Sequence, residues 1–403
     1  MKALSGGFFA SIVIAATFEV MGQSGSGFTG KLLPFTKTET ARILQFGPWP
    51  PAWMPDPSNR VSGKAAAIAL GRTLFFDRRL SRTGSASCST CHLPERLFTD
   101  GRARGEGFVE LDRNTPGLLN VRLNRWFGWD GAADSLWSQS LRPILDTREM
   151  GASTSHVGTL MRDDSLLARA YEMAFGEPPS DDDTVSVNTG KALAAFQETL
   201  SSGRTAFDEF RDALERGDTD AASRYPLEAQ RGLQTFVGRG NCAVCHSGPN
   251  FTNGEFGDIG IAFFVAPGRV DPGRYEGIRK LQASRANLLG EYSDDPARAT
   301  ATGTRHVTLQ HRNWGEFRVP SLRNLVGTGP YMHAGQLANL RDVVRHYSEL
   351  NEERLHADGE RILKPLHLTD GETRDLVVFL ESLSETSPKR GEAPRRQGSP
   401  APR

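Results

Sequence analysis

The sequence predicts a mainly α-helical protein with two similar halves. The same five-residue pattern, C-x-x-C-H, occurs at residues 88–92 and again at residues 242–246. Each copy follows a segment in which apolar residues recur at helical spacing, and strand-like alternation of apolar and polar residues is scarce. A chain of 403 residues is also long enough for two or three domains with sizeable cores.

Charge and hydropathy exclude two broad classes of protein. The chain has 48 Lys+Arg and 48 Asp+Glu, so it lacks the basic excess expected of a nucleic-acid-binding protein. The longest apolar stretch, residues 8–18, is too short to cross a bilayer, which takes about 20 residues. A polytopic membrane protein is therefore excluded.

The N-terminus has the layout of an export signal. Lys2 precedes the apolar stretch, as in a basic region followed by a hydrophobic region, and we assign residues 1–24 to the signal. A buried N-terminal helix is the alternative. No clear A-x-A cleavage site follows, so an uncleaved anchor stays open.

The remaining segments are predicted in chain order. Residues 25–60 are rich in Pro, Gly and Trp and are expected to be irregular and to wrap a surface. Helices are predicted at residues 63–76, before the first motif, at 187–200, and at 227–236, before the second motif. The expected units are an N-terminal domain at 61–202, a C-terminal domain at 203–384 and a disordered tail at 385–403.

C-x-x-C-H is the attachment pattern of c-type haem. Two thiols on one helical turn can each form a thioether to the haem, and the histidine that follows can bind the iron. The predicted attachment residues are Cys88, Cys91, His92, Cys242, Cys245 and His246.

Three other readings of the cysteines fit less well. A zinc site would need the two C-x-x-C pairs about 15–20 residues apart, whereas about 150 residues separate Cys91 from Cys242. A redox dithiol would need one pair and no histidine, and disulfides would leave both histidines unexplained. Haem attachment takes place outside the bacterial cytoplasmic membrane, which agrees with the export signal and predicts a periplasmic protein.

The second axial ligand of each iron decides its chemistry. The first Met and the first His after the first motif are Met150 and His156, so no such ligand lies close behind it. The first haem is therefore expected to be open to peroxide. In the second half the one methionine is Met332.

Residues 74–77, 114–150 and 317–347, together with both motifs, resemble the bacterial di-haem cytochrome c peroxidase and MauG family over residues 60–385. The resemblance implies two cytochrome-c-like domains with long loops, each holding one covalent haem c, and one Ca²⁺ between them. It also implies the roles of individual residues. Trp129 would carry electrons between the haems, Gln139 and Glu149 would assist peroxide cleavage, and Pro143 would shape their pocket. The calcium ligands would be Asn114, Thr328 and Pro330.

Each of these residues also has a structural alternative. Trp129 could be a core aromatic residue, and Gln139 and Glu149 could be surface side chains. We further expect Arg318 and Arg323 to pair with haem propionates, for which guanidinium groups are well suited. His333 is assigned no chemistry.

Tyr347 falls where peroxidases of this family have a methionine ligand and where MauG has a tyrosinate. A packed tyrosine is the alternative, and His346 is the nearest competing ligand. A tyrosinate favours oxidised iron, which places the chain nearer the MauG and MbnH-like branch. One departure opposes this. MauG has a tryptophan exit residue where Gly240 stands here, and Trp126, Trp137 and Trp314 are all candidates to replace it.

The expected function is that of a periplasmic peroxidase-class oxidoreductase. Hydrogen peroxide would create a high-valent di-haem state that oxidises an aromatic residue, tryptophan first of all, of a partner protein. The alternatives are a cytochrome c peroxidase supplied with electrons by a small cytochrome or copper protein, and a non-enzymatic di-haem carrier, which would require two six-coordinate irons. No nucleic acid and no membrane span beyond a possible signal anchor are expected.

Overall fold

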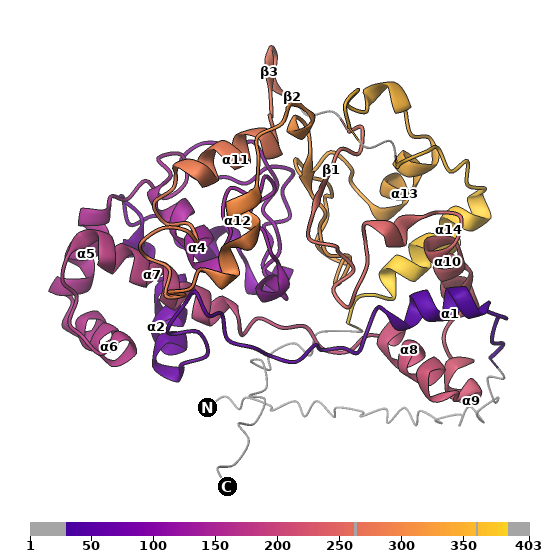
Figure 1. Ribbon diagram of the computed structural model, residues 1–403, viewed down its shortest axis with the longest axis horizontal. Helices are drawn as coiled ribbons and strands as arrows, with labels where there is room; N and C mark the ends of the chain where they lie inside the picture. The colour runs from indigo at the N-terminus through magenta and orange to yellow at the C-terminus, as the bar shows by residue number, and fades with distance from the viewer. Residues whose placement is uncertain (1–29, 262–263, 360–361, 386–403) are drawn as a thin grey trace, which may run out of the picture.

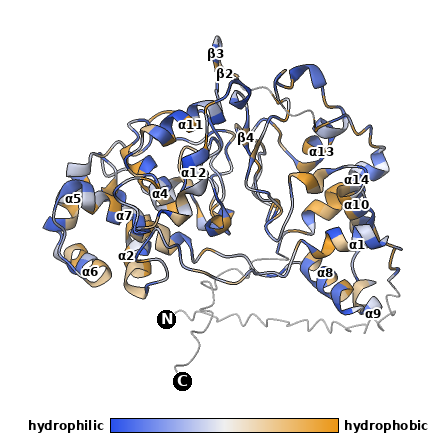
Figure 2. Cartoon of the chain, in the orientation of Figure 1, coloured by the Kyte–Doolittle hydropathy of each residue, from blue (hydrophilic) through white to orange (hydrophobic). Residues whose placement is uncertain are grey.

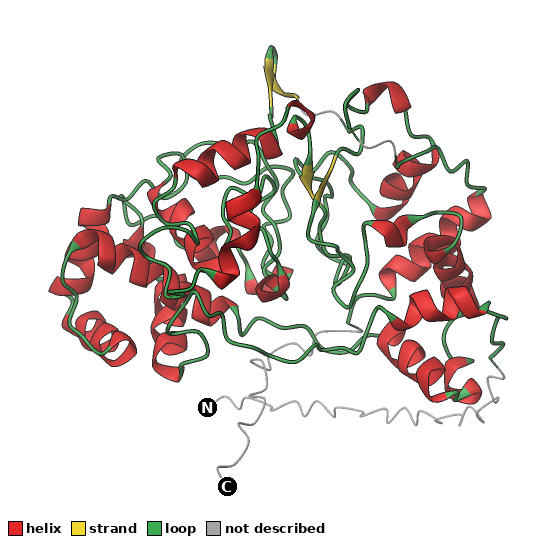
Figure 3. Ribbon diagram, in the orientation of Figure 1, coloured by secondary structure: helices red, strands yellow, loops and turns green. Residues whose placement is uncertain are grey.

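The computed structural model describes residues 30–385 except 262–263 and 360–361. Helices joined by long loops dominate these residues, and the strands are only two or three residues long (Figure 3). The predicted mainly helical fold is therefore confirmed. The predicted signal at 1–24 and residues 386–403 of the predicted tail lie outside the described residues. Within the described chain, no helix is both long and apolar enough to cross a membrane.

The helices form two groups on either side of the irregular segments and of the β1–β4 pair (Figure 1). The first group comprises α2 (Ala65–Phe76), α3 (Cys88–Cys91), α4 (Leu136–Leu145), α5 (Thr154–Asp163), α6 (Ser165–Phe175), α7 (Asp182–Gln197), α11 (Arg274–Ala283) and α12 (Thr302–His306). The second group comprises α1 (Lys37–Leu44), α8 (Ala206–Arg216), α9 (Thr219–Ala222), α10 (Leu227–Val237), α13 (Leu340–Ser348) and α14 (Asp370–Glu381).

Short elements complete the described chain. The 3₁₀ turns are η1 (Arg78–Leu80), η2 (Pro94–Arg96), η3 (Val121–Leu123), η4 (Cys242–Val244), η5 (Ala299–Ala301), η6 (His311–Asn313) and η7 (Glu352–Arg354). The strands are β1 (Phe256–Gly257), β2 (Phe264–Ala266), β3 (Arg269–Val270) and β4 (Phe317–Arg318). β1 pairs antiparallel with β4, and β2 pairs antiparallel with β3.

The core of the first half is built on α2 and α7, which pack against each other. Leu70, Leu74 and Phe75 of α2 are buried in this core. A Cβ atom at Gly71 would lie 1.9 Å from the Ala192 carbonyl oxygen, so glycine is what lets the two helices approach so closely. This contact positions the first C-x-x-C-H motif, which follows α2.

The core of the second half uses the same device. Figure 2 shows apolar residues gathered in α10 and α14, which pack against each other. A Cβ atom at Gly232 of α10 would lie 2.1 Å from the Asp375 carbonyl oxygen of α14. Buried phenylalanines fill this core: Phe46, Phe207, Phe210, Phe236, Phe251 and Phe379. The helices predicted at 63–76, 187–200 and 227–236 correspond to α2, α7 and α10.

The segment expected to be irregular, residues 25–60, differs from the prediction because it contains α1. Thr36 and Glu39 cap each other's backbone N–H groups at the start of this helix, which satisfies two donors that a helix end leaves open. Ile43 is buried in the core of the second half. The first helix of the described chain therefore packs against the core of the second half.

A single boundary at residue 202 does not describe the packing either. The segment that carries α11 and α12 lies against the first half, although it belongs to the predicted 203–384 domain (Figure 1). Asp134, two residues before the start of α4, accepts hydrogen bonds from the Leu288 N–H (2.9 Å) and the Thr304 hydroxyl (2.7 Å). Lys191 of α7 forms an ion pair with Asp294 (2.6 Å). These buried polar contacts attach the segment to α4 and α7.

Residues 114–146 and 318–350 form an internal repeat. Each residue of the first copy corresponds to the residue 204 positions later in the second copy. Asn120 and Asn324 both have positive φ angles, 62° and 59°. Isolated bridges pair Phe127 with Ala133 and Tyr331 with Leu337. Ala133 and Leu337 each stand two residues before the N-cap of the next helix. The helices that follow, α4 and α13, are thus equivalent elements of the two halves.

Candidate functional site

The two motif histidines are held in the same way. His92 Nδ1 lies 2.9 Å from the Phe98 carbonyl oxygen, and His246 Nδ1 lies 3.1 Å from the Phe251 carbonyl oxygen. Burial lowers the pKa of His246 to about 4 and also lowers the pKa of His92. Both imidazoles are therefore neutral near pH 7, and a hydrogen bond at Nδ1 leaves Nε2 for a metal.

A second carbonyl acts on each motif histidine, and it comes from the repeat. The backbone carbonyl of Pro116 raises the pKa of His92, and that of Pro320 raises the pKa of His246, so each lies close to its imidazole. Pro116 and Pro320 stand at equivalent positions of the repeat. We did not predict these residues from the sequence. The signal available was the pattern P-x-L-x-N, present at 116–120 and again at 320–324.

The motif cysteines are thiols in this structure. No disulfide joins the four cysteines, all of which lie within the described residues. Burial raises the pKa of Cys88 and of Cys242 to about 12 and that of Cys91 to about 11. A neutral, sheltered thiol three residues from a second one, with a neutral histidine next in sequence, is the donor set that a c-type haem requires.

The second motif faces a cavity of about 1330 Å³ that extends to the junction of the two halves. Cys242, Cys245, His246 and Tyr347 all line it. Burial, followed by the two cysteine sulfurs, raises the pKa of Tyr347, so the phenol lies within electrostatic reach of the motif. His346, the competing ligand, instead directs Nε2 to the Ile259 carbonyl oxygen (2.8 Å).

Pro143 of α4 is the counterpart of Tyr347 in the repeat. Each is the eighth residue after the N-cap of its helix, Ser135 for α4 and Asn339 for α13. Each N-cap side chain accepts a hydrogen bond from the backbone N–H three residues later. Proline has no donor atom for a metal, so the first half lacks a ligand where the second half has a phenol.

The first motif lies near two further predicted residues. Burial, followed by the charge of Asp146, raises the pKa of Glu149 to about 7, while Arg142 and Arg148 oppose this shift. The Glu149 charge in turn acts on the pKa of Cys88 and Cys91, so the carboxyl group lies within electrostatic reach of the motif. A carboxyl group with a pKa near neutrality can both accept and donate a proton.

Gln139 of α4 presents an unsatisfied atom. Its Oε1 is buried and has no hydrogen-bond partner within the described chain. A Cβ atom at Gly128 would lie 3.5 Å from this oxygen, which places it beside the loop that carries Trp129. Buried polar atoms are nearly always paired, so this one is a candidate to bind a ligand.

Trp129 lies at the junction of the two halves. Its Nε1–H donates to the Asn114 carbonyl oxygen (2.9 Å), and its own carbonyl accepts from the Arg318 N–H (2.8 Å). The Asn114 N–H donates to the His333 carbonyl oxygen (2.8 Å). Arg318 is the repeat counterpart of Asn114, and His333 that of Trp129, so the two backbone bonds are related by a pseudo-twofold axis.

The two arginines expected to contact propionates differ in their surroundings. Arg318 lines the cavity, and burial lowers its pKa to about 10. It forms no ion pair with any carboxylate of the described residues, so an anion supplied by a ligand would compensate its charge. Arg323 is instead bidentate to Asp208 (2.8 and 3.0 Å) and donates to the Pro249 carbonyl. Its contact with a propionate would have to use the N–H groups that remain.

The three residues expected to bind calcium, Asn114, Thr328 and Pro330, line the same cavity. Asn114 Nδ2 donates to the Arg102 carbonyl oxygen (2.7 Å), which leaves the amide oxygen for a cation. Oxygen donors suit a hard cation such as Ca²⁺. His333, to which no chemistry was assigned, stacks on Phe317 with ring centroids 3.6 Å apart, and burial lowers its pKa to about 4.

The structure also places the candidate exit residues. A Cβ atom at Gly240 would lie 2.7 Å from the Thr235 carbonyl oxygen, so this backbone does not accommodate a tryptophan there. Trp126 lines the cavity, with the guanidinium of Arg274 4.4 Å from its ring. Trp137 is fully buried and donates to Ser58 (3.0 Å). Trp314 packs against Tyr275 with centroids 5.0 Å apart.

Comparison with known proteins shows which family this chain resembles. Residues 65–216 match the family model described as di-haem cytochrome c peroxidase. The chain is 39% identical over 318 residues to the methylamine utilization protein MauG of Methylorubrum extorquens, which covers 78% of this chain and 77% of that protein. It is 32% identical over 368 residues to the cytochrome-c peroxidase IdrP1 of Denitromonas iodatirespirans, with 90% and 92% covered.

Two solved structures of related proteins are similar to this chain in fold. A MauG-like protein associated with microbial copper homeostasis matches with a TM-score of 0.64 and 27% identity, covering 85% of this chain and 96% of that one. The di-haem peroxidase BthA of Burkholderia thailandensis matches in fold, with a TM-score of 0.63, 22% identity, and 83% and 88% covered. The chain belongs to the di-haem cytochrome c peroxidase and MauG family. It is therefore an oxidoreductase that uses peroxide, in a family whose members carry two haems.

Proposed function

We propose that this protein is a periplasmic enzyme that takes two oxidising equivalents from hydrogen peroxide and delivers them to an aromatic residue, tryptophan first of all, of a partner protein. The observation that carries the proposal is the position of Tyr347. α13 directs a phenol, and no thioether, toward the second C-x-x-C-H motif. A tyrosinate stabilises oxidised iron, whereas a methionine raises the reduction potential and suits electron entry.

Covalent attachment of both haems is part of the proposal. In each half the two thiols would add across the vinyl groups, and His92 or His246 would bind the iron through Nε2. The haem irons, once bound, supply the redox chemistry. Every other step falls to the chain's own residues.

Glu149 and Gln139 would act on peroxide in the first half. Glu149 would take the proton from one peroxide oxygen and return it to the other as the O–O bond breaks. A pKa of about 7 favours both transfers at neutral pH. The unpaired Oε1 of Gln139 would accept a hydrogen bond from bound peroxide. Two protons and two electrons convert peroxide to two waters.

Trp129 would connect the halves electronically. Its indole is fixed by one hydrogen bond to Asn114, and its backbone is bonded to Arg318, so the ring is held at the junction. Ca²⁺ bound by Asn114, Thr328 and Pro330 would hold the same junction from the cavity side. Removal of Ca²⁺ by a chelator should therefore weaken communication between the haems, which their coupled EPR spectra would report.

The competing activity is that of a cytochrome c peroxidase, since relatives with that name also match. The deciding experiment adds peroxide to the diferric enzyme without a donor and follows its absorption and EPR spectra. The proposal expects an oxidised state that persists and that reduced small cytochromes discharge slowly. Rapid turnover with reduced cytochrome c, without any persistent state, would assign the peroxidase activity instead.

A further inference from the structure

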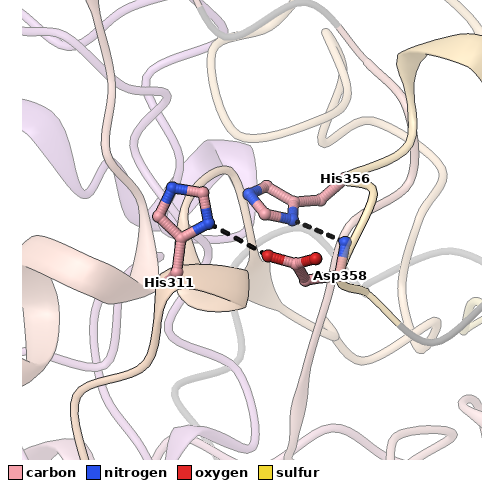
Figure 4. Close-up of side chains that lie close together, drawn as sticks. All are labelled: His311, His356 and Asp358. Atoms are coloured by element: carbon pink, nitrogen blue, oxygen red, sulfur yellow. Dashed lines mark hydrogen bonds and ion pairs between the residues drawn. The ribbon is translucent and has the colours of Figure 1, made fainter.

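A second cluster of metal-binding side chains lies apart from the haem motifs. His311 begins η6, and His356 and Asp358 follow η7 in the loop after α13 (Figure 4). One ligand atom from each residue lies within 4.8 Å of the other two. The two imidazole rings are 4.9 Å apart between centroids, at 67°. Two segments that are distant in sequence thus bring two nitrogens and a carboxylate together.

One of the three distances is already close to the spacing of ligands around an ion, and the other two are no longer than 4.8 Å. Tetrahedral ligands about 2.1 Å from a metal stand about 3.4 Å from one another. His311 Nδ1 and Asp358 Oδ2 are 3.2 Å apart, which already meets this spacing. The His311 and Asp358 side chains are 75% and 65% exposed, so they can rotate by the small amounts that the other two distances require.

The backbone around the cluster is fixed without a metal. The His356 N–H donates to Asp258 Oδ2 (2.6 Å), and Asp258 Oδ1 accepts from the Gly260 N–H (2.9 Å). On the other segment, the Gln310 N–H donates to Asn313 Oδ1 (2.9 Å), which closes the turn that carries His311. The backbone that carries the ligands is therefore held in place before any ion arrives, which reduces the entropy lost on binding.

We propose that His311, His356 and Asp358 bind a divalent transition-metal ion, Zn²⁺ or Cu²⁺, with water in the remaining position. Imidazole nitrogen suits both ions, and a carboxylate completes a three-ligand set with one open position. Ca²⁺ and Mg²⁺ prefer oxygen ligands and would bind weakly here. None of the three residues belongs to the haem motifs or to the predicted calcium ligands, although His356 lines the same cavity.

The ion would restrain the rim of the cavity that the second motif faces. His356 and Gly359 line this cavity from the loop after α13, and Arg312 and Asn313 line it from the η6 segment. Coordination would join these two segments by bonds stronger than the present His311–Asp358 contact. Access to the cavity beside Tyr347 would then depend on metal occupancy.

The test uses the holoenzyme without a polyhistidine tag, treated with a chelator and resupplied with Ca²⁺. Zn²⁺, Cu²⁺ and Mg²⁺ are titrated separately, and bound metal is measured by calorimetry and elemental analysis. The expected result is one Zn²⁺ or Cu²⁺ per chain, and the tighter of the two identifies the ion. His356→Gln and Asp358→Asn should each weaken binding by about tenfold or more, the scale on which even outer partners act. His306→Gln, which removes an exposed histidine outside the cluster, should leave it unchanged.

Hydrogen exchange locates the ion independently of affinity. Bound metal should slow amide exchange in residues 306–316 and 352–359 of the wild type and should have no such effect in His356→Gln. Equal binding by the wild type and the His311→Gln/His356→Gln double variant would overturn the proposal. So would the absence of a stoichiometric Zn²⁺ or Cu²⁺.

Discussion

Pro143 and Tyr347 occupy the same position in two equivalent helices, α4 and α13. Both follow a capping residue by eight positions, and both helices follow a bridge that closes the preceding loop. The two halves therefore share a scaffold and differ in the side chain at this position. Proline offers no donor atom in the first half, whereas the tyrosine presents a phenol to the cavity in the second.

This relationship predicts that Pro143→His closes the first haem. The imidazole would enter at the ligand position, convert a high-spin iron to low spin, and suppress the reaction with peroxide because the open coordination position is lost. Low-temperature EPR and stopped-flow absorption after peroxide addition measure both effects. Pro143→Ala provides the matched control and should stay high spin. A high-spin first haem in Pro143→His would refute the equivalence of the two positions.

Replacing Tyr347 should alter the second haem alone. Tyr347→Phe removes the phenol and should change the absorption and EPR spectrum of that haem, while the first haem keeps its own signals. Tyr331→Phe is the control, because Tyr331 also lines the cavity but donates its hydroxyl to the Leu325 carbonyl (2.8 Å). If the two variants have identical spectra, Tyr347 is not a ligand.

Glu149 predicts the pH dependence of peroxide cleavage. Its carboxylate can accept a proton only when ionised, so kcat/KM for peroxide should rise as pH increases through about 7. Glu149→Gln should lower kcat/KM by roughly 10²–10⁴-fold and abolish the rise. Asp146→Asn removes a negative charge that raises the pKa of Glu149, so it should shift the rise to lower pH. An unchanged profile in Asp146→Asn would contradict this assignment.

A second buried carboxyl group predicts how stability depends on pH. Burial raises the pKa of Glu198 to about 7, above the 4.5 of a free glutamate, although Ser62 donates a hydrogen bond to it. The folded state thus holds this proton more tightly than the unfolded state does. Its contribution to stability is fully present below about pH 4.5 and is lost as pH rises through about 7.

Glu198→Gln cannot ionise and should therefore be relatively more stable at alkaline pH. Relative to its effect at about pH 5, the substitution should increase the free energy of unfolding at about pH 8 by on the order of 3 kcal/mol, from the size of the pKa difference. Denaturant unfolding at both pH values measures this. Glu177→Gln, which removes an exposed partner of Arg60, should show no comparable pH dependence. A pH-independent effect of Glu198→Gln would disprove the assignment.

Local sequence was enough to predict the elements that carry the chemistry. The helices before both motifs have apolar residues at helical spacing, and α2 and α10 form where this spacing indicates. The thiols and histidines of the motifs are adjacent in sequence, so no tertiary information was needed to group them. The helix α1 was missed although Thr36 and Glu39 supply a capping box, because the surrounding prolines and glycines suggested irregular structure.

Long-range packing accounts for what could not be predicted. The segment with α11 and α12 returns to the first half through contacts of Asp134 and Lys191, and no local pattern indicates such a crossing. The repeat could not be recognised from the sequence because its two copies share few residue types. It is recognised in the structure from matching φ angles, bridges and helix caps. The ion pair of Arg323 with Asp208 was likewise not predictable, because it depends on both side chains being buried together.

The sequence by itself determined the cofactor-binding motifs, the helical class and the family resemblance, since each depends on residues near one another in the chain. Only the tertiary structure decided that Pro143 and Tyr347 are counterparts and that Trp129 and His333 meet their partners across a pseudo-twofold junction. It also decided that His311, His356 and Asp358 come together. Such relationships depend on how distant segments pack, and packing is set by the complementary shapes and buried charges of whole surfaces, which no single segment encodes.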